Sequence, residues 1–259
     1  MKVLFLDYDG TLRVPNTDQV SKESITSLDT IRKRGNLAFI NTGRCYYSIG
    51  NQVEHLPIDG LICGCGTYIR YHDTVLYEVK ANAIQKEKVV HALRQYQVDA
   101  FLEGHAGLFM DQRYSDYTNR VVALFEKQGV YMRPVNADDF EFSKMSLYYK
   151  SEEQKRNFEK ALQKDFDFIT FPNLKAEAVL RHHSKATGMK KILNELHLPM
   201  ESSIAFGDSD NDEDMLKAAH CSVLIGDNAP HLSEWATIKA PSADDEGITW
   251  ALQKMNLLD

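Results

Sequence analysis

A short apolar run that ends in two aspartates constrains the fold of this chain more than any other feature. Val3 to Leu6 is apolar and partly β-branched or aromatic, which is typical of a strand buried on both faces of a parallel sheet. The residues Asp7-Tyr8-Asp9-Gly10-Thr11 follow it directly. Open α/β sheets bind their ligands beyond the carboxyl ends of the strands, so this position predicts a functional site.

The order of the elements that follow favours an α/β fold. Ser21 is placed to cap a helix that Gly35 ends, with apolar residues at three-residue spacing between them. Residues 36–40 are predicted as a second strand. The alternation returns near the other end, with a helix that has an apolar stripe from Met189 to Leu196 and a strand over residues 203–206. We therefore expect a Rossmann-like core with a mainly parallel sheet.

The middle of the chain has a different order. Strand-like and helix-like segments there form a mixed α+β pattern without regular strand–helix–strand alternation. The simplest interpretation is a second domain inserted into the first. The expected division gives residues 1–80 and 181–259 to the core and residues 81–180 to the insertion.

Length and composition exclude several classes of protein. The chain has 259 residues, 43% of them hydrophobic and 26% charged, which is ordinary for a globular protein with a substantial core. Its 30 Lys and Arg against 37 Asp and Glu give a net charge of −7, which disfavours nucleic acid or an anionic membrane as the main partner. The four cysteines follow neither a disulfide framework nor a zinc-site spacing, and the longest apolar runs are far too short to span a membrane. We expect a cytoplasmic monomer or small homo-oligomer.

Two acidic loops are candidates for a metal site. Residues two apart on extended chain point to the same side, so the carboxylates of Asp7 and Asp9 can face one pocket. A second acidic loop, Gly207 to Asp212, follows a predicted strand and opens a helix. An acidic turn and a helix cap are the ordinary alternatives, but a cap needs only one acid. Converging carboxylates repel one another unless a cation neutralises them, and oxygen ligands select a hard ion such as Mg²⁺. Asp210 is expected to be a solvated bystander.

Two further segments supply groups that suit a phosphoryl ligand. Lys185 stands just before a predicted helix, and Thr42-Gly43-Arg44 follows a predicted strand. Each alone is an ordinary surface feature. Beside an acidic Mg²⁺ site, hydroxyl and backbone N–H donors from Thr42 and Gly43 and a point charge from Lys185 suggest a phosphoryl-binding pocket.

Four segments in this order resemble the four motifs of the haloacid dehalogenase superfamily. They are Asp7-x-Asp9-Gly10-Thr11, Thr42-Gly43-Arg44, Lys185-Ala186-Thr187-Gly188 and Gly207-Asp208-x-x-Asn211-Asp212. The long insertion between the second and third resembles the large α/β cap of the Cof-like sugar-phosphate phosphatase branch. The resemblance implies a Mg²⁺-dependent phosphomonoester hydrolase that acts on small phosphorylated metabolites, most of all sugar phosphates, and whose cap closes over the site.

The resemblance also implies a role for each residue. Asp7 would be the nucleophile that forms an aspartyl-phosphate, and Asp9 the acid that protonates the leaving oxygen and then the base that activates water. The metal would be held by Asp7, the backbone carbonyl of Asp9, and Asp208, with Asp212 in support. The phosphoryl oxygens would be held by Thr42, Gly43, Lys185 and Asn211, and Arg44 would have a less uniform role.

Several residues depart from the family pattern or attract a further interpretation. Cys65 stands where relatives usually carry an asparagine, and this change either alters substrate contacts or is neutral. Tyr8 stands where many relatives have an aliphatic residue, and we expect its side chain to pack against the core. The stretch from Glu103 to Gly107 is a candidate substrate loop of the cap, although a simple turn explains it equally well. His182 and His183 point oppositely on extended chain and are interpreted as linker residues.

Two other functions remain open at this stage. Sugar phosphomutases occur on a similar fold, and they return the phosphoryl group to a sugar instead of to water. A non-enzymatic signalling or binding protein would use phosphorylation of Asp7 as its signal. Asp9 argues against the second alternative, because a base two residues after the nucleophile favours turnover of the aspartyl-phosphate.

Overall fold

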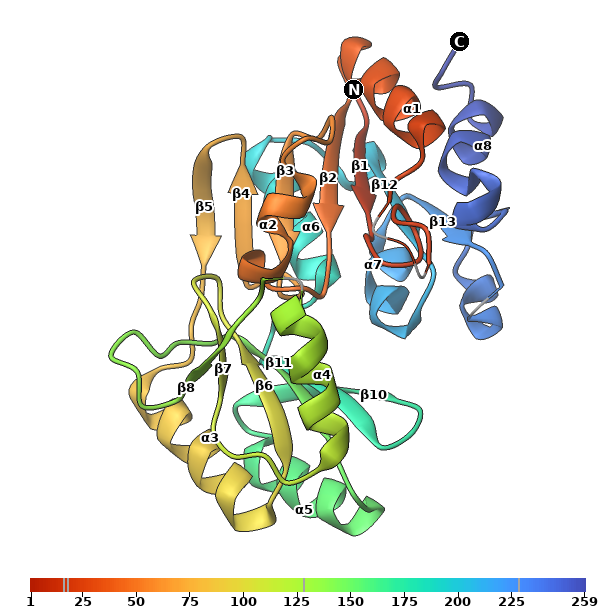
Figure 1. Cartoon of the computed structure of the whole chain (residues 1–259). Coiled ribbons are helices and arrows are strands. Elements are labelled where there is room, and N and C mark those ends of the chain that lie inside the picture. The colour runs from red at the N-terminus through yellow and green to blue at the C-terminus, as the bar shows by residue number, and fades with distance from the viewer. Residues whose placement is uncertain (16, 18, 128, 228) are drawn as a thin grey trace. The chain divides into compact units, whose positions relative to one another are not determined.

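The computed structural model describes residues 1–15, 17, 19–127, 129–227 and 229–259. It divides into two compact units, drawn together in Figure 1. The first unit contains Met1–Gly43, Val53–Tyr77 and His183–Asp259, and the second contains Arg44–Gln52 and Glu78–His182. The domain boundaries expected near residues 81 and 180 stay a prediction, because compactness alone does not show that a segment folds independently.

The first unit is built on an eight-stranded sheet with the order β14-β13-β12-β1-β2-β3-β4-β5. The pairs from β14 to β3 are parallel, and β4 runs antiparallel to β3. The strands are β1 (Val3–Leu6), β2 (Leu37–Asn41), β3 (Gly60–Cys63), β4 (Tyr68–Tyr71), β5 (Thr74–Glu78), β12 (Ser203–Gly207), β13 (Cys221–Ile225) and β14 (Ile238–Ala240). Because β1 lies between the parallel strands β2 and β12, the carboxyl ends of all three strands meet at one edge.

Helices cover this sheet on both faces. The helices are α1 (Lys22–Lys33), α6 (Lys185–Glu195), α7 (Glu213–Ala218) and α8 (Gly247–Lys254), with 3₁₀ turns at Met200–Ser202, Asp210–Asp212, Pro230–Glu234 and Ala243–Asp245. Helix α2 (Tyr46–Val53) belongs to the second unit except for Val53, where the chain returns to the first unit. Figure 1 shows α1 beside α8, where Ser27 Oγ lies 2.9 Å from Thr249 Oγ1. The predicted N-cap at Ser21 is confirmed, since its side chain accepts a hydrogen bond from Ser24 N at 3.0 Å.

Strand β1 is buried on both faces, as its composition predicts. Val3 and Phe5 belong to a core cluster with Met189 and Ile192 of α6 and Met215 of α7. The alternate residues of β1, which point to the opposite face, are equally buried. This burial fixes the register of β1, because a shift by one residue would exchange its two faces.

The second unit holds a six-stranded sheet with the order β10-β11-β9-β6-β7-β8. Its strands are β6 (Asp99–Glu103), β7 (Leu108–Met110), β8 (Met132–Pro134), β9 (Lys144–Tyr148), β10 (Phe166–Phe171) and β11 (Lys175–Leu180). Residues of α3 (Ala83–Tyr96) and α5 (Glu152–Leu162) form one core cluster with the sheet. Residues of α4 (Asp116–Lys127), including Val122, pack against Phe101 in a separate cluster, because alternate residues of β6 point to opposite faces.

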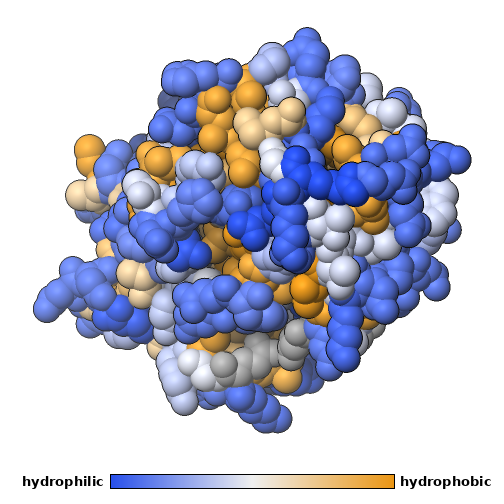
Figure 2. Space-filling model, turned by 90° about the horizontal axis from the view of Figure 1, so that it is seen from above, coloured by the Kyte–Doolittle hydropathy of each residue, from blue (hydrophilic) through white to orange (hydrophobic). Residues whose placement is uncertain are grey.

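On the face seen in Figure 2, hydrophilic residues predominate and apolar residues appear in separate groups. Among the described residues, none of the helices is long and apolar enough to cross a membrane. The expected fold class, a mainly parallel α/β sheet together with an α+β unit, is confirmed.

Candidate active site

The candidate site lies at the carboxyl edge of the first unit's sheet. Asp7 follows β1, Thr42 follows β2 and Asp208 follows β12. The pairing of Leu6 with Ile40 and Phe206 puts these three strand ends level with one another. All three polar side chains are buried, so they are held by the protein and not by solvent.

Lys185 brings a buried positive charge to this edge. It is the first residue of α6, and the helix is capped by Ser184, whose side chain accepts from Thr187 N. The Lys185 backbone carbonyl accepts a hydrogen bond from Asn41 Nδ2 at 2.9 Å. The side chain of Lys185 has no exposed surface. Its ammonium group is therefore positioned by the helix start and by β2.

The Lys185 ammonium connects three of the four motifs. Its Nζ lies 2.6 Å from Asp7 Oδ1, 2.6 Å from Asp212 Oδ1 and 2.9 Å from Asn211 Oδ1. Three donor protons and three acceptors form a saturated arrangement. The structure thus brings together Asp7, Lys185, Asn211 and Asp212, as the motifs predict.

Asp208 completes a group of three buried carboxylates. Oxygens of Asp7, Asp208 and Asp212 all lie within 4.8 Å of one another. Thr11 Oγ1 donates to Asp208 Oδ1 at 2.8 Å, a contact that sequence reasoning missed. Gly10 has a φ of +88°, and a Cβ at this position would come within 2.4 Å of Asp208 Oδ2. Only glycine lets the β1 turn approach Asp208 this closely.

Burial and mutual repulsion shift the ionisation of this group. Burial raises the pKa of Asp7 well above its ordinary value, Lys185 acts in the opposite direction, and Asp212 and Asp208 raise it further. Burial and the Asp212 charge raise the pKa of Asp208 to about 6. Burial alone would lower the pKa of Lys185, but Asp212 and Asp7 outweigh it and the pKa is raised. Lys185 therefore stays protonated, and its single positive charge is too little to balance the three carboxylates.

The Asp9 carboxylate has a different neighbour. Its Oδ1 accepts a hydrogen bond from Arg13 Nε at 2.9 Å, and Arg13 Nη2 pairs with the same oxygen. Among the described residues, the clustered ligating atoms at this edge come from the Asp7 group and not from Asp9. Sequence reasoning missed Arg13; its spacing of four from Asp9 was the available signal. Asp210, expected to be a bystander, is partly exposed and pairs with His231 at 2.9 Å.

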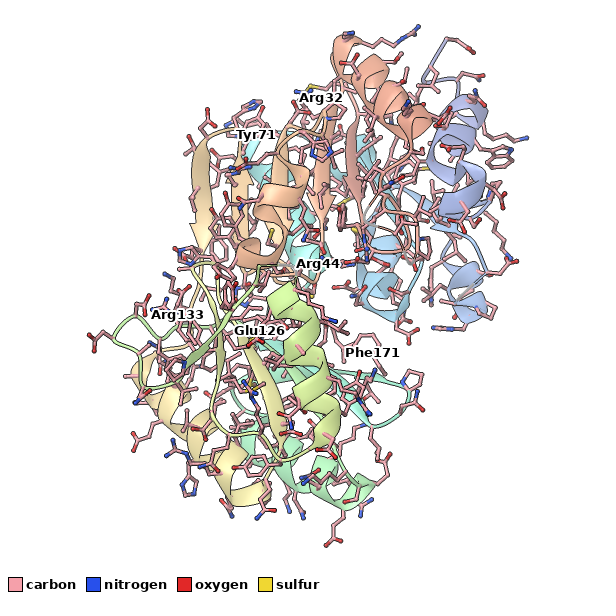
Figure 3. The ribbon with its side chains drawn as sticks, in the orientation of Figure 1. Arg32, Arg44, Tyr71, Glu126, Arg133 and Phe171 are labelled. Atoms are coloured by element: carbon pink, nitrogen blue, oxygen red, sulfur yellow. The ribbon has the colours of Figure 1, made fainter. Side chains whose placement is uncertain are left out.

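The residues of the second motif are divided between the two units. Thr42 is buried in the first unit, where its N–H donates to Ile62 O at 2.8 Å. Gly43 follows it in the same unit. Arg44, labelled in Figure 3, belongs to the second unit, and its Nη1 donates to Gln52 Oε1 at 3.4 Å. The phosphate-binding roles of Thr42 and Gly43 and the supporting role of Arg44 stay a prediction.

Cys65 occupies a backbone conformation that explains the expected preference for asparagine. Its φ is +52°, in the left-handed region where asparagine is enriched. Its N–H donates to Thr42 O at 3.1 Å, and the residue is buried. The neighbouring Gly66 packs so closely on α6 that a Cβ would lie 2.4 Å from Ser184 O. This turn therefore supports the start of the helix that carries Lys185.

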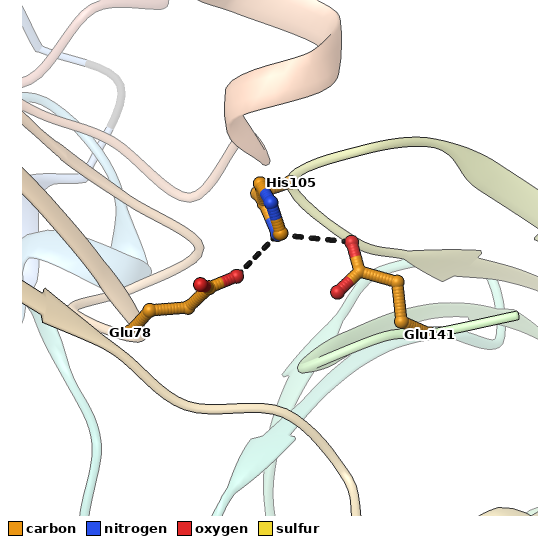
Figure 4. A group of neighbouring side chains, drawn as sticks. All are labelled: Glu78, His105 and Glu141. Atoms are coloured by element: carbon orange, nitrogen blue, oxygen red, sulfur yellow. Dashed lines mark ion pairs between the residues drawn. The ribbon is translucent and has the colours of Figure 1, made fainter. Parts of the chain in front are cut away.

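A second group of ligating side chains lies in the second unit. Figure 4 shows His105 between Glu78 and Glu141, with its Nδ1 3.0 Å from Glu141 Oε1 and paired with Glu78 Oε1. Lys80 Nζ also pairs with both carboxylates, at 2.6 Å from Glu141 and 3.0 Å from Glu78. Lys80 thus already supplies one positive charge that both carboxylates share. Its geometry is that of an ion-pair network, and the predicted role of the 103–107 stretch as a substrate loop stays a prediction.

Comparison with known proteins decides the family. The family of haloacid dehalogenase-like hydrolases matches residues 4–252. The chain belongs to this family. The phosphatase YwpJ of Bacillus subtilis strain 168 is 25% identical over 295 residues, covering 98% of this chain and all (100%) of YwpJ. The 5-amino-6-(5-phospho-D-ribitylamino)uracil phosphatase YitU of the same organism is 22% identical, covering 97% of this chain and 96% of YitU.

Solved structures of the family agree with this result. A structure reported in an analysis of BT1666 from Bacteroides thetaiotaomicron, among phosphatases of the superfamily, superposes with a TM-score of 0.87. It is 25% identical and covers 99% of this chain and 96% of its own. The haloacid dehalogenase-like chain described here is accordingly a hydrolase of the phosphatase type.

The buried acids fit the divalent metal that hydrolases of this family generally use. Oxygens of the three carboxylates lie within 4.8 Å of one another, and all their ligating atoms are oxygens. Oxygen-only donor sets suit Mg²⁺, Mn²⁺ or Ca²⁺ and not softer ions. Asp7, Asp208 and Asp212 are the described side chains that would hold or support such an ion.

Proposed function

We propose that this chain is a Mg²⁺-dependent phosphomonoester hydrolase that acts on small phosphorylated metabolites through an aspartyl-phosphate at Asp7. The observation that carries the proposal is the contact of one buried ammonium, Lys185, with Asp7 and Asp212, beside the buried Asp208. This arrangement provides an anionic nucleophile and positive charge to receive a phosphoryl group. Family membership supports the same reaction class.

In the first half-reaction, an Asp7 carboxylate oxygen attacks phosphorus and the ester oxygen leaves. Lys185, already 2.6 Å from Asp7 Oδ1, reduces the repulsion between the carboxylate and the phosphoryl oxygens. Thr42, Gly43 and Asn211 donate hydrogen bonds to the phosphoryl oxygens. Asp9 gives a proton to the leaving oxygen, so the alcohol departs neutral.

In the second half-reaction, Asp9, now ionised, takes a proton from water as the water oxygen attacks phosphorus. The phosphorus–Asp7 bond breaks, the Asp7 carboxylate is regenerated and inorganic phosphate leaves. The same residue serves as acid and then as base because its own proton transfer changes its state.

Mg²⁺, when bound, would supply the charge that cancels the repulsion between three carboxylates and a phosphate dianion. We assign it to Asp7, Asp208 and the backbone carbonyl of Asp9. Asp212 supports this set through Lys185, and through the N–H groups of Asp208 and Ser209, which donate to Asp212 Oδ2 at 3.0 and 3.1 Å.

Sugar phosphates and phosphorylated polyols are the substrate class we favour. YitU, similar over nearly the whole length of this chain, is named for a substrate with a phosphorylated ribityl group. The second unit would act as the cap that contributes the leaving-group pocket. The test is a screen of purified protein with Mg²⁺ against phosphorylated sugars, polyols, nucleotides and cofactors, with kcat/KM measured for each. We expect the highest values among sugar and polyol phosphates; highest values among nucleotides would contradict this substrate class.

The two alternatives make different products. A phosphomutase would convert a hexose 1-phosphate into its isomer, while the proposed hydrolase releases inorganic phosphate and free sugar. A phospho-Asp signalling protein would keep a stable adduct on Asp7 without continued phosphate release. Chromatography of the sugar products together with a phosphate assay separates all three.

Proton-coupled metal binding gives a pH prediction. The folded-state pKa of Asp208 is about 6, above its ordinary 3.8, so the metal-free folded state holds a proton that the unfolded state has lost between these values. Protonation of Asp208 therefore adds on the order of 3 kcal/mol to the free energy of unfolding of the metal-free protein. This contribution is fully present below pH 3.8 and is lost as the pH rises through about 6. Mg²⁺ competes with that proton, so its apparent affinity should rise by up to about tenfold per pH unit below 6 and level off above it.

Calorimetric titration with Mg²⁺ from pH 5 to 8 checks this prediction. The melting temperature with Mg²⁺ minus that with EDTA should grow between pH 5 and 7. An affinity that does not change across this range would show that Asp208 is already ionised in the metal-free protein. The variant Asp210→Asn serves as a control, because that carboxylate is partly exposed and pairs with His231.

A further inference from the structure

Arg13 holds the Asp9 carboxylate in a defined position. Its Nε donates to Asp9 Oδ1 at 2.9 Å, and Nη2 pairs with the same oxygen. The Arg13 side chain is 17% exposed and the Asp9 side chain 37% exposed. The guanidinium is therefore largely enclosed while the carboxylate it holds remains accessible to a substrate or a water molecule.

The backbone fixes the place from which Arg13 reaches Asp9. Arg13 N donates to Tyr8 O at 2.7 Å, and Gly10 N donates to Arg13 O at 3.2 Å. These two hydrogen bonds close the turn that follows β1 on itself. Arg13 Nη1 also donates to Thr17 O. The guanidinium is thus also attached to the backbone at Thr17.

The ring of Tyr8 makes a further contact with the same guanidinium. The Arg13 Cζ lies 5.7 Å from the centre of the Tyr8 ring, which is within the range of a cation–π contact. Tyr8 is only 2% exposed, so the ring is held by the core. Tyr8 therefore packs in the core and also restricts the movement of the Arg13 guanidinium.

We infer that Arg13, supported by Tyr8, is a positioning residue that holds the ionised Asp9 carboxylate for the second half-reaction, the attack of water on phospho-Asp7. The inference rests on the proposed function. A guanidinium can only donate hydrogen bonds, so it pairs with the carboxylate form, and this is the form that accepts a proton from water. General-base catalysis requires the base within hydrogen-bond reach of that proton. A carboxylate restrained by two bonds at one oxygen occupies fewer competing orientations.

The test compares Arg13→Met with wild type on 4-nitrophenyl phosphate. Its leaving group needs little help from an acid, so kcat/KM, which reports the first half-reaction, should stay within about threefold. We expect kcat to fall by about 10- to 100-fold, because the slowed step is hydrolysis of phospho-Asp7. Rapid mixing should show a burst of 4-nitrophenolate of about one equivalent per enzyme. A merely structural role would lower kcat and kcat/KM together and give no such burst.

Three further variants make the result specific. Arg13→Lys keeps a positive charge and should recover part of kcat. Adding Arg13→Met to Asp9→Asn should slow hydrolysis no further, because Arg13 acts through Asp9. Arg94→Met, which removes an arginine that pairs with Asp111 in the second unit, should behave as wild type.

Two results would overturn the inference. One is an unchanged kcat in Arg13→Met; the other is a full Arg13→Met effect in the Asp9→Asn background. If the wild-type protein released no phosphate, the proposed function would be wrong. If the wild-type protein released phosphate and the Arg13 variants released it equally fast, only the inference about Arg13 would be wrong.

Discussion

Replacing Asp7 by asparagine is expected to lower phosphate release by about 10⁴-fold or more, because the residue is the proposed nucleophile. Asparagine has the same shape, and its amide oxygen can still accept from Lys185 Nζ. The variant should therefore fold, and circular dichroism should match wild type. Phosphate release from 4-nitrophenyl phosphate, measured with saturating Mg²⁺, gives the result.

The matched control for this variant is Asp210→Asn. Asp210 lies in the second acidic loop, Gly207 to Asp212, but its side chain is 42% exposed and pairs with His231. We expect it to keep wild-type activity. Full activity in Asp7→Asn would mean that another residue attacks phosphorus.

Replacing Lys185 by methionine is expected to reduce both stability and activity. The buried Lys185 ammonium contacts Asp7 and Asp212 at 2.6 Å, so its removal leaves buried carboxylates without that charge. Removing one partner of a buried ion pair typically destabilises by about 3–5 kcal/mol. Loss of one preorganised charge from a phosphoryl site should reduce kcat/KM by about 10²- to 10³-fold.

The pH dependence of this variant identifies the cause. Asp7 and Asp208 have raised pKa values, so in Lys185→Met they can relieve their repulsion by protonation at low pH. The loss in melting temperature should therefore be smaller at pH 5 than at pH 7.5, and Mg²⁺ should restore part of it. Lys190→Met changes an exposed lysine of the same helix and should leave stability and activity unaltered. An equal loss at both pH values would point to packing and not to charge.

The local elements of the core could be predicted well from the sequence. Burial on both faces makes Val3 to Leu6 continuously apolar, and Ser21 marks a helix start by a contact only three residues away. These features depend on short-range sequence. The strand predicted over residues 36–40 lies at Leu37–Asn41, one residue later, because the ends of elements depend on pairing with neighbours.

The convergence of the site could be inferred only through the resemblance. Lys185 is 178 residues from Asp7 in sequence, and no local pattern predicts that their side chains meet. The pairing of Asp9 with Arg13, four residues later, was not predicted. Alternation on extended chain suggests one pocket for Asp7 and Asp9, but the chain already turns at Tyr8, whose carbonyl accepts from Arg13 N. The Asp9 carboxylate pairs with Arg13 and is not among the clustered carboxylates of the described residues.

Direct detection of phosphate on Asp7 tests the central claim most closely. The Asp9→Asn variant lacks the proposed base, so the covalent intermediate should accumulate during reaction with 4-nitrophenyl phosphate and Mg²⁺. Acid quenching followed by peptide mass spectrometry should find one added phosphoryl group on the peptide that contains Asp7, and none in the Asp7→Asn, Asp9→Asn double variant. Continued product formation by Asp9→Asn with an unmodified Asp7 peptide, or a phosphoryl group on another residue, would contradict the account.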